Sequence, residues 1–205
     1  MSGRTLARHR AMFPNSETTR QFIADHFRKR RTPLTEEAIL ASITARRSKH
    51  DVYWGVLALR DFGTTRSIPT LKDLLDYPMQ DVKDCSLLTI AHIAGAAETP
   101  FYLEALAHKG SRKAYPMWAI QVAADERAVP AVIELVRAAL RKALRPKPAD
   151  PGDAYIPGLK YFVRLGIDRP EIQSSIDLFK KAWANLPEGH RTVLRTALPS
   201  HVIPE

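Results

Sequence analysis

The feature that most constrains this sequence is an internal repeat of about 30 residues. A helical segment opens at Asp51-Val52, turns near residue 64 and resumes as a second helical segment that carries a proline at its start. The same order returns three times, so that equivalent prolines stand at Pro69, Pro100, Pro130 and Pro170. Proline is tolerated in the first turn of a helix because the N–H that it lacks would have no intrahelical partner there. The repeat therefore predicts four helix–turn–helix units.

The apolar residues within these units are spaced for helices rather than for strands. Val52, Val56, Leu59 and Phe62 follow one another at intervals of four, three and three, whereas a strand would alternate by two. A short helix pair cannot bury its apolar face alone, so neighbouring pairs must stack and share a core. The residues expected in that core include Leu71, Leu103, Ile120 and Val132.

The first unit also resembles a known family. Its pattern consists of Asp51-Val52, Ala58-Leu59, Gly63, Ile68-Pro69 and the leucines at 71, 74 and 75. This pattern resembles the short HEAT-like repeats of the phycobilisome-lyase type, and the resemblance extends over roughly residues 51–183. It implies an all-α fold, a right-handed α-solenoid of HEAT-like helix pairs, and a role mainly in binding. The chromophore-lyase activity of some family members has no residue pattern of its own that can be located here.

The remaining chain is expected to complete a single solenoid domain over residues 1–205. Residues 1–50 form an N-terminal helical cap, with Ser16 and Thr32-Pro33 as helix starts, and residues 51–142 form three repeats. A proline-rich insertion over 143–158 cannot continue a helix and is a candidate contact element or a tolerated surface loop. A degenerate fourth repeat over 159–186 and a C-terminal cap over 187–205 follow.

The positive charge lies at the two ends of the sequence. Residues 1–50 hold 11 Lys and Arg against 4 Asp and Glu, residues 51–136 hold 8 against 11, and residues 137–205 hold 12 against 7. The resulting +7, −3 and +5 sum to the net charge of +9. A groove that follows a phosphate backbone would need cations in every repeat, but the second helices here are mixed in the first half and basic only in the second.

No familiar catalytic motif occurs in the sequence. The nucleotide-binding, acyl-transfer and zinc-protease signatures are absent, as is the His-Glu dipeptide on which di-iron HEAT-like hydroxylases depend. His50-Asp51 has two interpretations, a metal-binding pair with His26 as partner, or an Asp51 that caps a repeat helix as Asp81 does. The capping interpretation is preferred, and we expect no catalytic residue, metal or cofactor.

The tryptophans and the single cysteine also have ordinary interpretations. Trp54, Trp118 and Trp183 fall on apolar faces, so core packing is favoured over the aromatic cleft of a HEAT-like DNA glycosylase. Cys85 cannot form an internal disulfide, which fits a reducing compartment. With no apolar run of about 20 residues and no secretory signal, we expect no membrane association and a cytoplasmic location.

These observations predict a non-enzymatic protein–protein interaction module. It would be an adaptor, an assembly chaperone or a toxin-immunity protein that binds an acidic partner surface. The alternative is a nucleic-acid-binding protein that uses the basic ends. The expected partner-binding residues are Arg137, Arg141, Lys142, Lys180 and Lys181.

Overall fold

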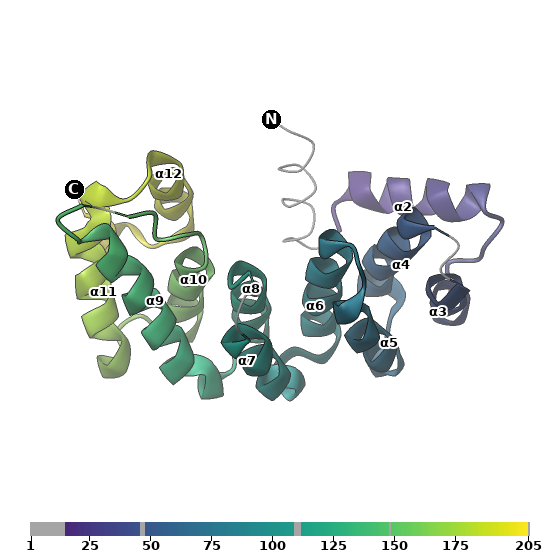
Figure 1. Ribbon diagram of the computed structural model, residues 1–205, viewed down its shortest axis with the longest axis horizontal. Coiled ribbons are helices and arrows are strands. Elements are labelled where there is room, and N and C mark those ends of the chain that lie inside the picture. Colours follow the sequence, from purple (N-terminus) through teal and green to yellow (C-terminus); the bar gives the residue numbers. More distant parts are fainter. Residues whose placement is uncertain (1–14, 46–47, 109–111, 148, 205) are drawn as a thin grey trace. The chain divides into compact units, whose positions relative to one another are not determined.

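The computed structural model describes residues 15–45, 48–108, 112–147 and 149–204, and the regular elements in these ranges are all helical (Figure 1). The first 14 residues of the expected N-terminal cap, together with Ser111 and Pro148, lie outside the described residues. The all-α prediction is confirmed, while the right-handed solenoid and the single domain stay predictions. The chain divides into two compact units, Met1–Glu98 and Thr99–Glu205, which are described separately below.

Unit 1 consists of helices joined by short turns. The α-helices are α2 (Glu17–Lys29), α3 (Glu36–Ala45), α4 (Lys49–Phe62), α5 (Ile68–Asp73) and α6 (Gln80–Ala94). Three 3-10 turns complete the unit: η1 (Thr65–Ser67), η2 (Leu74–Asp76) and η3 (Gly95–Glu98). Helix α4 lies at its centre, packed against α2, α3 and α6.

Unit 2 is built in the same way. Its α-helices are α7 (Thr99–Ala107), α8 (Ala114–Ala123), α9 (Val129–Ala143), α10 (Tyr155–Leu165), α11 (Pro170–Ala182) and α12 (Glu188–Ala197). The 3-10 turns are η4 (Glu126–Ala128), η5 (Trp183–Asn185) and η6 (Ser200–Val202). Helices α8 and α10 pack together, as do α9 and α11, so the first and second helices of two successive pairs form two layers (Figure 1).

The four repeats predicted from the sequence correspond to the helix pairs α4–α5, α6–α7, α8–α9 and α10–α11. The four equivalent prolines all lie in the first turn of the second helix, as expected from the missing N–H. The division between the two compact units falls inside the second pair, between Glu98 and Thr99.

The predicted core residues are buried with one exception. Leu71, Ile120 and Val132 are at most 1% exposed. Leu103 is only half-buried, so its prediction was wrong, because the buried stripe of α7 passes through Tyr102 and Leu106 instead. Residues 102 and 106 are one helical turn apart, and Leu103 lies about 100° away from the first of them.

Of the two helices in the N-terminal cap, α2 starts where the sequence predicted and α3 does not. Ser16 caps α2, and its Oγ accepts a hydrogen bond from the Thr19 N–H at 3.2 Å, as predicted. The helix expected to follow Thr32-Pro33 starts only at Glu36, and its described residues are Glu36–Ala45. Thr35 takes the capping role, since its Oγ1 accepts from the Ala38 N–H at 3.4 Å.

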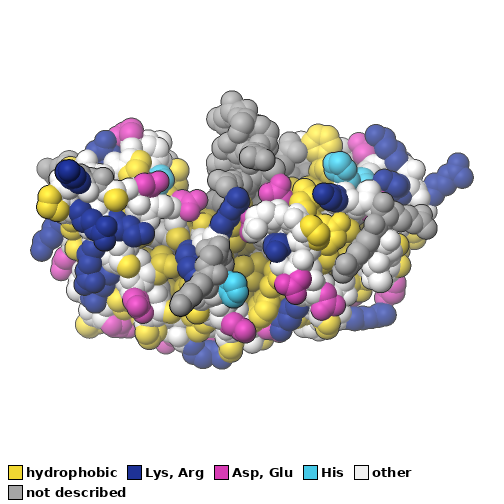
Figure 2. Space-filling model, in the orientation of Figure 1, with side chains coloured by type: hydrophobic (Ala, Val, Ile, Leu, Met, Phe, Trp, Pro, Cys, Tyr) yellow, Lys and Arg dark blue, Asp and Glu magenta, His cyan; other side chains and the backbone are white. Residues whose placement is uncertain are grey.

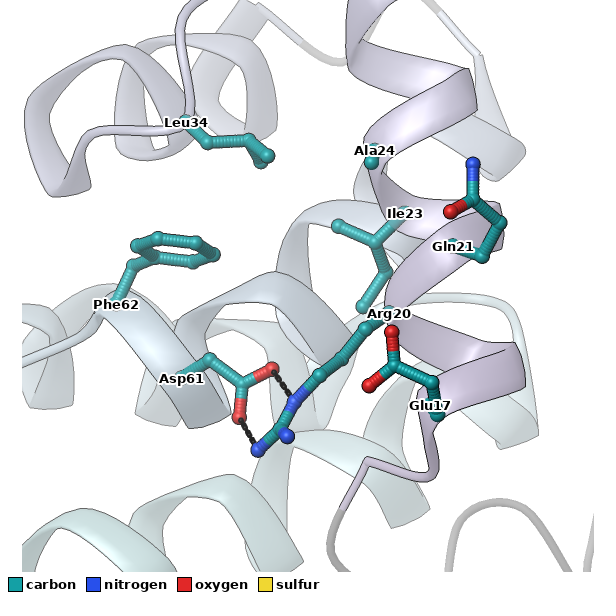
Figure 3. Close-up of a pocket in the computed structure, with 8 residues that line it drawn as sticks. All are labelled: Glu17, Arg20, Gln21, Ile23, Ala24, Leu34, Asp61 and Phe62. Atoms are coloured by element: carbon teal, nitrogen blue, oxygen red, sulfur yellow. Dashed lines mark hydrogen bonds and ion pairs between the residues drawn. The ribbon is translucent and has the colours of Figure 1, made fainter.

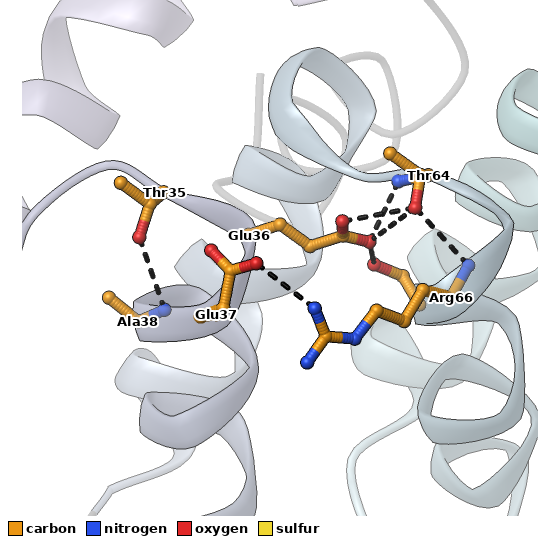
Figure 4. A network of polar contacts seen from close by, with 7 residues as sticks. Thr35, Glu36, Glu37, Ala38, Thr64 and Arg66 are labelled. Carbon is orange, nitrogen blue, oxygen red and sulfur yellow. Dashed lines mark hydrogen bonds and ion pairs between the residues drawn. The ribbon is translucent and has the colours of Figure 1, made fainter.

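A carboxylate from α3 holds the turn between the two helices of the first repeat (Figure 4). Glu36 Oε1 accepts from the Thr64 N–H at 2.8 Å and from the Ser67 hydroxyl at 2.5 Å. Beside it, Glu37 forms an ion pair with Arg66 at 3.0 Å. The cap is therefore fixed to the repeat by polar contacts as well as by the packing of α3 on α4.

The proline-rich segment is shorter than the expected 143–158. Helix α9 continues to Ala143 and α10 begins at Tyr155, so that Pro157 and Gly158 are helical. Pro157 is the third residue of α10, where the N–H that it lacks would have no intrahelical partner.

Candidate interaction surfaces

Four of the five predicted partner-binding residues form an exposed basic surface on unit 2. Arg141 and Lys142 lie in the last turn of α9, and Lys180 and Lys181 lie in the last turn of α11. All four are exposed, and none forms an ion pair with another described residue. We call these residues the cationic corner.

The two helix ends that carry the cationic corner are held next to each other. The Asn185 side-chain amide, just beyond α11, donates to the carbonyl of Ala143 at the end of α9 at 3.1 Å. Figure 2 shows the result, with Lys and Arg side chains gathered over the C-terminal parts of α9 and α11 at the left of the view. Cations at helix C-termini are also favoured by the helix dipole, which accounts for part of this arrangement without any partner.

Arg137, the fifth predicted residue, has a different role. It is half-buried, and its guanidinium donates to the hydroxyls of Ser174 and Ser175 on α11, the latter at 3.2 Å. Its expected full exposure was wrong, because the side chain lies in the seam between the two packed helices. Arg137 therefore positions α9 against α11 and is not a free cation of the corner.

The proline-rich loop adjoins the cationic corner. The Ala149 N–H donates to the carbonyl of Lys142 at 3.2 Å, which holds the loop against the end of α9. Arg145 and Lys147 are exposed within it. The structure thus places the loop beside the predicted surface, and its role as a contact element stays a prediction.

A shallow pocket of about 390 Å³ opens on unit 1 between α2, the end of the α2–α3 connection and the end of α4 (Figure 3). Leu34 and Phe62 form its apolar wall, and Phe62 is 40% exposed. At its rim Arg20 donates to both carboxylate oxygens of Asp61, at 3.1 and 3.2 Å. These two charges neutralise each other, and Glu17 and Gln21 are the other polar residues of the lining.

The His50-Asp51 doublet has a structural role that differs from both sequence interpretations. Ser48, not Asp51, is the N-cap of α4, and its Oγ accepts from the Asp51 N–H at 3.1 Å. The Ser48 hydroxyl in turn donates to Asp51 Oδ2 at 2.7 Å, so the two residues are joined by a pair of hydrogen bonds in the first turn of α4. At the start of α6, Asp81 is likewise inside the helix, behind Met79.

The buried Asp51 carboxylate contacts a histidine and an arginine from the end of α2 and its C-cap. His26 Nε2 and the Arg30 guanidinium lie 3.1 and 3.0 Å from its Oδ1, and its side chain is only 4% exposed. The sequence suggested His26 as the partner, and the two do meet, but with Arg30 in contact the site is unsuited to a metal cation. Among the described residues, no three His, Cys, Asp or Glu side chains gather as a metal site would need.

Burial controls the protonation of His26. Desolvation lowers the pKa of His26, and the neighbouring Arg30 and His50 act in the same direction, while Asp51 opposes them. The imidazole is therefore neutral at pH 7.

Sequence reasoning missed an exposed aromatic group on unit 1. Trp118 and Trp183 are each 7% exposed and belong to the core as expected, but Trp54 is half-buried. Its ring centroid lies 6.2 Å from that of Phe22 and 6.2 Å from that of His26, and Phe22 is 44% exposed. The signal that could have found this group is the four-residue spacing of Phe22 and His26 on α2 and of Arg30 at its C-cap.

Comparison with known proteins supports the repeat interpretation. Residues 52–77 match the family model described as the PBS lyase HEAT-like repeat, and this match covers the first helix pair, α4–α5. Comparisons with curated proteins and with solved structures gave no match. Within the described part of the chain, no helix is both long and apolar enough to cross a membrane.

Proposed function

We propose that this chain, a HEAT-like repeat protein, is a non-enzymatic interaction module whose cationic corner binds an acidic surface of a protein partner. HEAT-like repeats generally mediate protein interactions, and adaptor, assembly chaperone and toxin-immunity protein are all roles that such binding would serve. A basic surface steers an acidic partner toward it and fixes the register of the complex.

The observation that carries the proposal is the contrast between the corner and other arginines of unit 2. Arg127 pairs with Asp125, and Arg169 pairs with both Glu126 and Glu171. Near the C-terminus, Arg191 and Arg195 share Glu188. None of the four cations of the corner forms such an ion pair with a described residue, so their charge is available to a partner.

The test uses two variants that lose the same charge. The corner variant carries Arg141→Gln, Lys142→Gln, Lys180→Gln and Lys181→Gln. The control variant carries Arg28→Gln, Lys29→Gln, Arg31→Gln and Lys49→Gln in unit 1. Because all eight residues are exposed, both variants should melt within a few degrees of the wild type. Arg137 is left unchanged because its loss would disturb the packing of α9 on α11.

A stoichiometric partner is first captured from nuclease-treated lysate and identified by mass spectrometry, and its association rate is then measured at low and moderate salt. The corner variant should associate about 10-fold more slowly at low salt and show a weaker salt dependence, while the control variant behaves as the wild type. Equal rates and equal salt dependence for the corner variant and the wild type would contradict the proposal. Loss of every partner after nuclease treatment would instead favour nucleic-acid binding.

A further inference from the structure

Unit 1 carries a second surface of different chemistry, formed by Phe22 and His26 from α2, by the C-cap residue Arg30 and by His50 and Trp54 from α4. We call it the aromatic–basic face. The residues of each helix are four apart and therefore follow one stripe, and the two helices pack against each other. The rings of Phe22 and His26 both lie 6.2 Å from Trp54, which makes a continuous patch of ring surface.

The buried Asp51 fixes the basic end of this patch. Its carboxylate contacts the Arg30 guanidinium at 3.0 Å, while the Arg30 side chain remains 48% exposed. Holding a long side chain in place in the free protein removes part of the entropy cost that binding would otherwise carry. The neutral His26, held by the same carboxylate, adds an uncharged ring between Arg30 and Trp54.

Further cations surround the face. Lys29 and Arg31 flank Arg30, and Lys49 precedes His50 at the first position of α4; all three are exposed and form no ion pair with another described residue. On the other side of Arg30, a hollow of about 280 Å³ opens between the α2–α3 connection and small residues of α3. The described residues among the first 50 hold six Lys and Arg against four Asp and Glu.

We infer that the aromatic–basic face binds single-stranded nucleic acid. A base stacks on the exposed ring of Phe22 beside Trp54, and the adjoining phosphates lie against Arg30, Lys29 and Lys49. Aromatic platforms within a basic surface bind single strands in this way, because every base has a flat π-face and every linkage carries a negative charge. A duplex keeps its bases stacked on one another and could use only the cations.

This inference does not rest on the role of the cationic corner. The cationic corner consists of cations alone, which suits the carboxylates of an acidic protein. The aromatic–basic face combines cations with aromatic rings. An acidic peptide would gain from the cations but has no base to place on Phe22. The two proposals involve different residues and different ligands, so either can fail while the other stands.

The test measures binding of the full-length protein to a fluorescein-labelled oligouridylate of about 12 nucleotides by anisotropy, and follows tryptophan fluorescence with the unlabelled strand. Wild-type protein should bind with an affinity that falls steeply with salt, and Trp54 should be quenched. Phe22→Ala should weaken binding by about 5- to 150-fold, the loss of one stacked base. Phe62→Ala is the matched control, because Phe62 is 40% exposed on the same unit but lies in the pocket of Figure 3.

Charge is tested with the two four-residue variants described above. The unit 1 variant removes Lys29, Arg31 and Lys49, which surround the face, together with Arg28, which forms an ion pair with Asp25 at 2.7 Å. This variant should reduce the salt slope by about 0.7 for each phosphate contact removed, while the corner variant keeps the wild-type slope. The Trp54→Phe variant keeps an aromatic ring at this position. It should therefore still bind the oligonucleotide, while the quenching of tryptophan fluorescence on binding disappears.

Three results would overturn the inference. The first is no binding of the oligonucleotide at low salt. The second is unchanged affinity of Phe22→Ala in a variant that melts with the wild type. The third is equal binding of polyglutamate or of phosphatidylserine-containing vesicles at matched charge, which would assign the face to acidic protein or to membrane surfaces instead.

Discussion

Replacing Gly158 by alanine should destabilise unit 2 even though alanine is the better helix former. Gly158 lies in the first turns of α10, where a Cβ atom would come 2.4 Å from Val136 Cγ2 and 3.4 Å from Met117 Cε. Val136 is fully buried, and its branched side chain has few alternative rotamers, so it cannot swing away. The contact must be relieved by moving α10 away from α9.

The expected magnitude follows from two opposing contributions. Alanine in place of glycine in a helix stabilises by about 0.5–1 kcal/mol, and forcing a methyl group into a packed core costs about 1–3 kcal/mol. The net loss is about 0.5–2 kcal/mol in the free energy of unfolding, which lowers the melting temperature by about 2–6 °C for a chain of this size.

Urea denaturation followed by circular dichroism measures this loss, and two further variants make the result specific. Gly189→Ala in α12 is the control, because its Cβ would meet no atom within 4 Å, and its stability should be equal to or higher than that of the wild type. In a Val136→Ala background the space opposite Gly158 is vacated, so Gly158→Ala should become neutral or stabilising. If Gly158→Ala is as stable as Gly189→Ala, or if the two changes at 136 and 158 are additive, the close approach of α9 and α10 is refuted.

Two further predictions concern unit 1. Leu71→Ala should reduce the free energy of unfolding by about 2–5 kcal/mol because its side chain is fully buried, and Leu75→Ala, at a half-buried position, should cost clearly less in the same denaturation assay. Glu36→Gln should cost about 1 kcal/mol near pH 7. Hydrogen bonds from Ser67 and Thr64 lower the pKa of Glu36, so this cost should shrink as the pH falls below the ordinary glutamate value of about 4.3 and vanish below the folded-state pKa; a cost independent of pH would contradict it.

The helix pairs could be predicted from the sequence because each one repeats the same local signals. A proline in the first turn of the second helix and apolar residues three and four apart need no knowledge of the tertiary structure. Leu103 shows the limit of that reasoning, since α7 has apolar residues on more than one side and only packing decides which side is buried. Tyr102 and Leu106 occupy the buried stripe instead.

The sequence rules for glycine and proline gave a wrong prediction at Pro157-Gly158, where helix packing determines the structure. Pro157-Gly158 marks a loop by local rules, but here the proline lies in an N-terminal turn and the glycine allows α10 to approach Val136. The same limit applies to Arg137, which sequence spacing places on the stripe of Arg141. Its burial comes from α11, whose Ser174 and Ser175 accept its hydrogen bonds.

The two basic surfaces illustrate why net charge alone is a weak guide to function. Residues 1–50 and 137–205 have excesses of +7 and +5, yet what each excess can bind depends on its neighbours. On α9 and α11 the exposed cations lie at helix ends and form no ion pair with another described residue, while near α2 and α4 the cations border a ring surface organised by a buried carboxylate. Variants that remove four charges from one surface or the other change the net charge equally. If each variant loses a different ligand, local geometry determines binding; if both lose the same ligand to the same extent, the charge acts as a diffuse field and neither surface is a specific site.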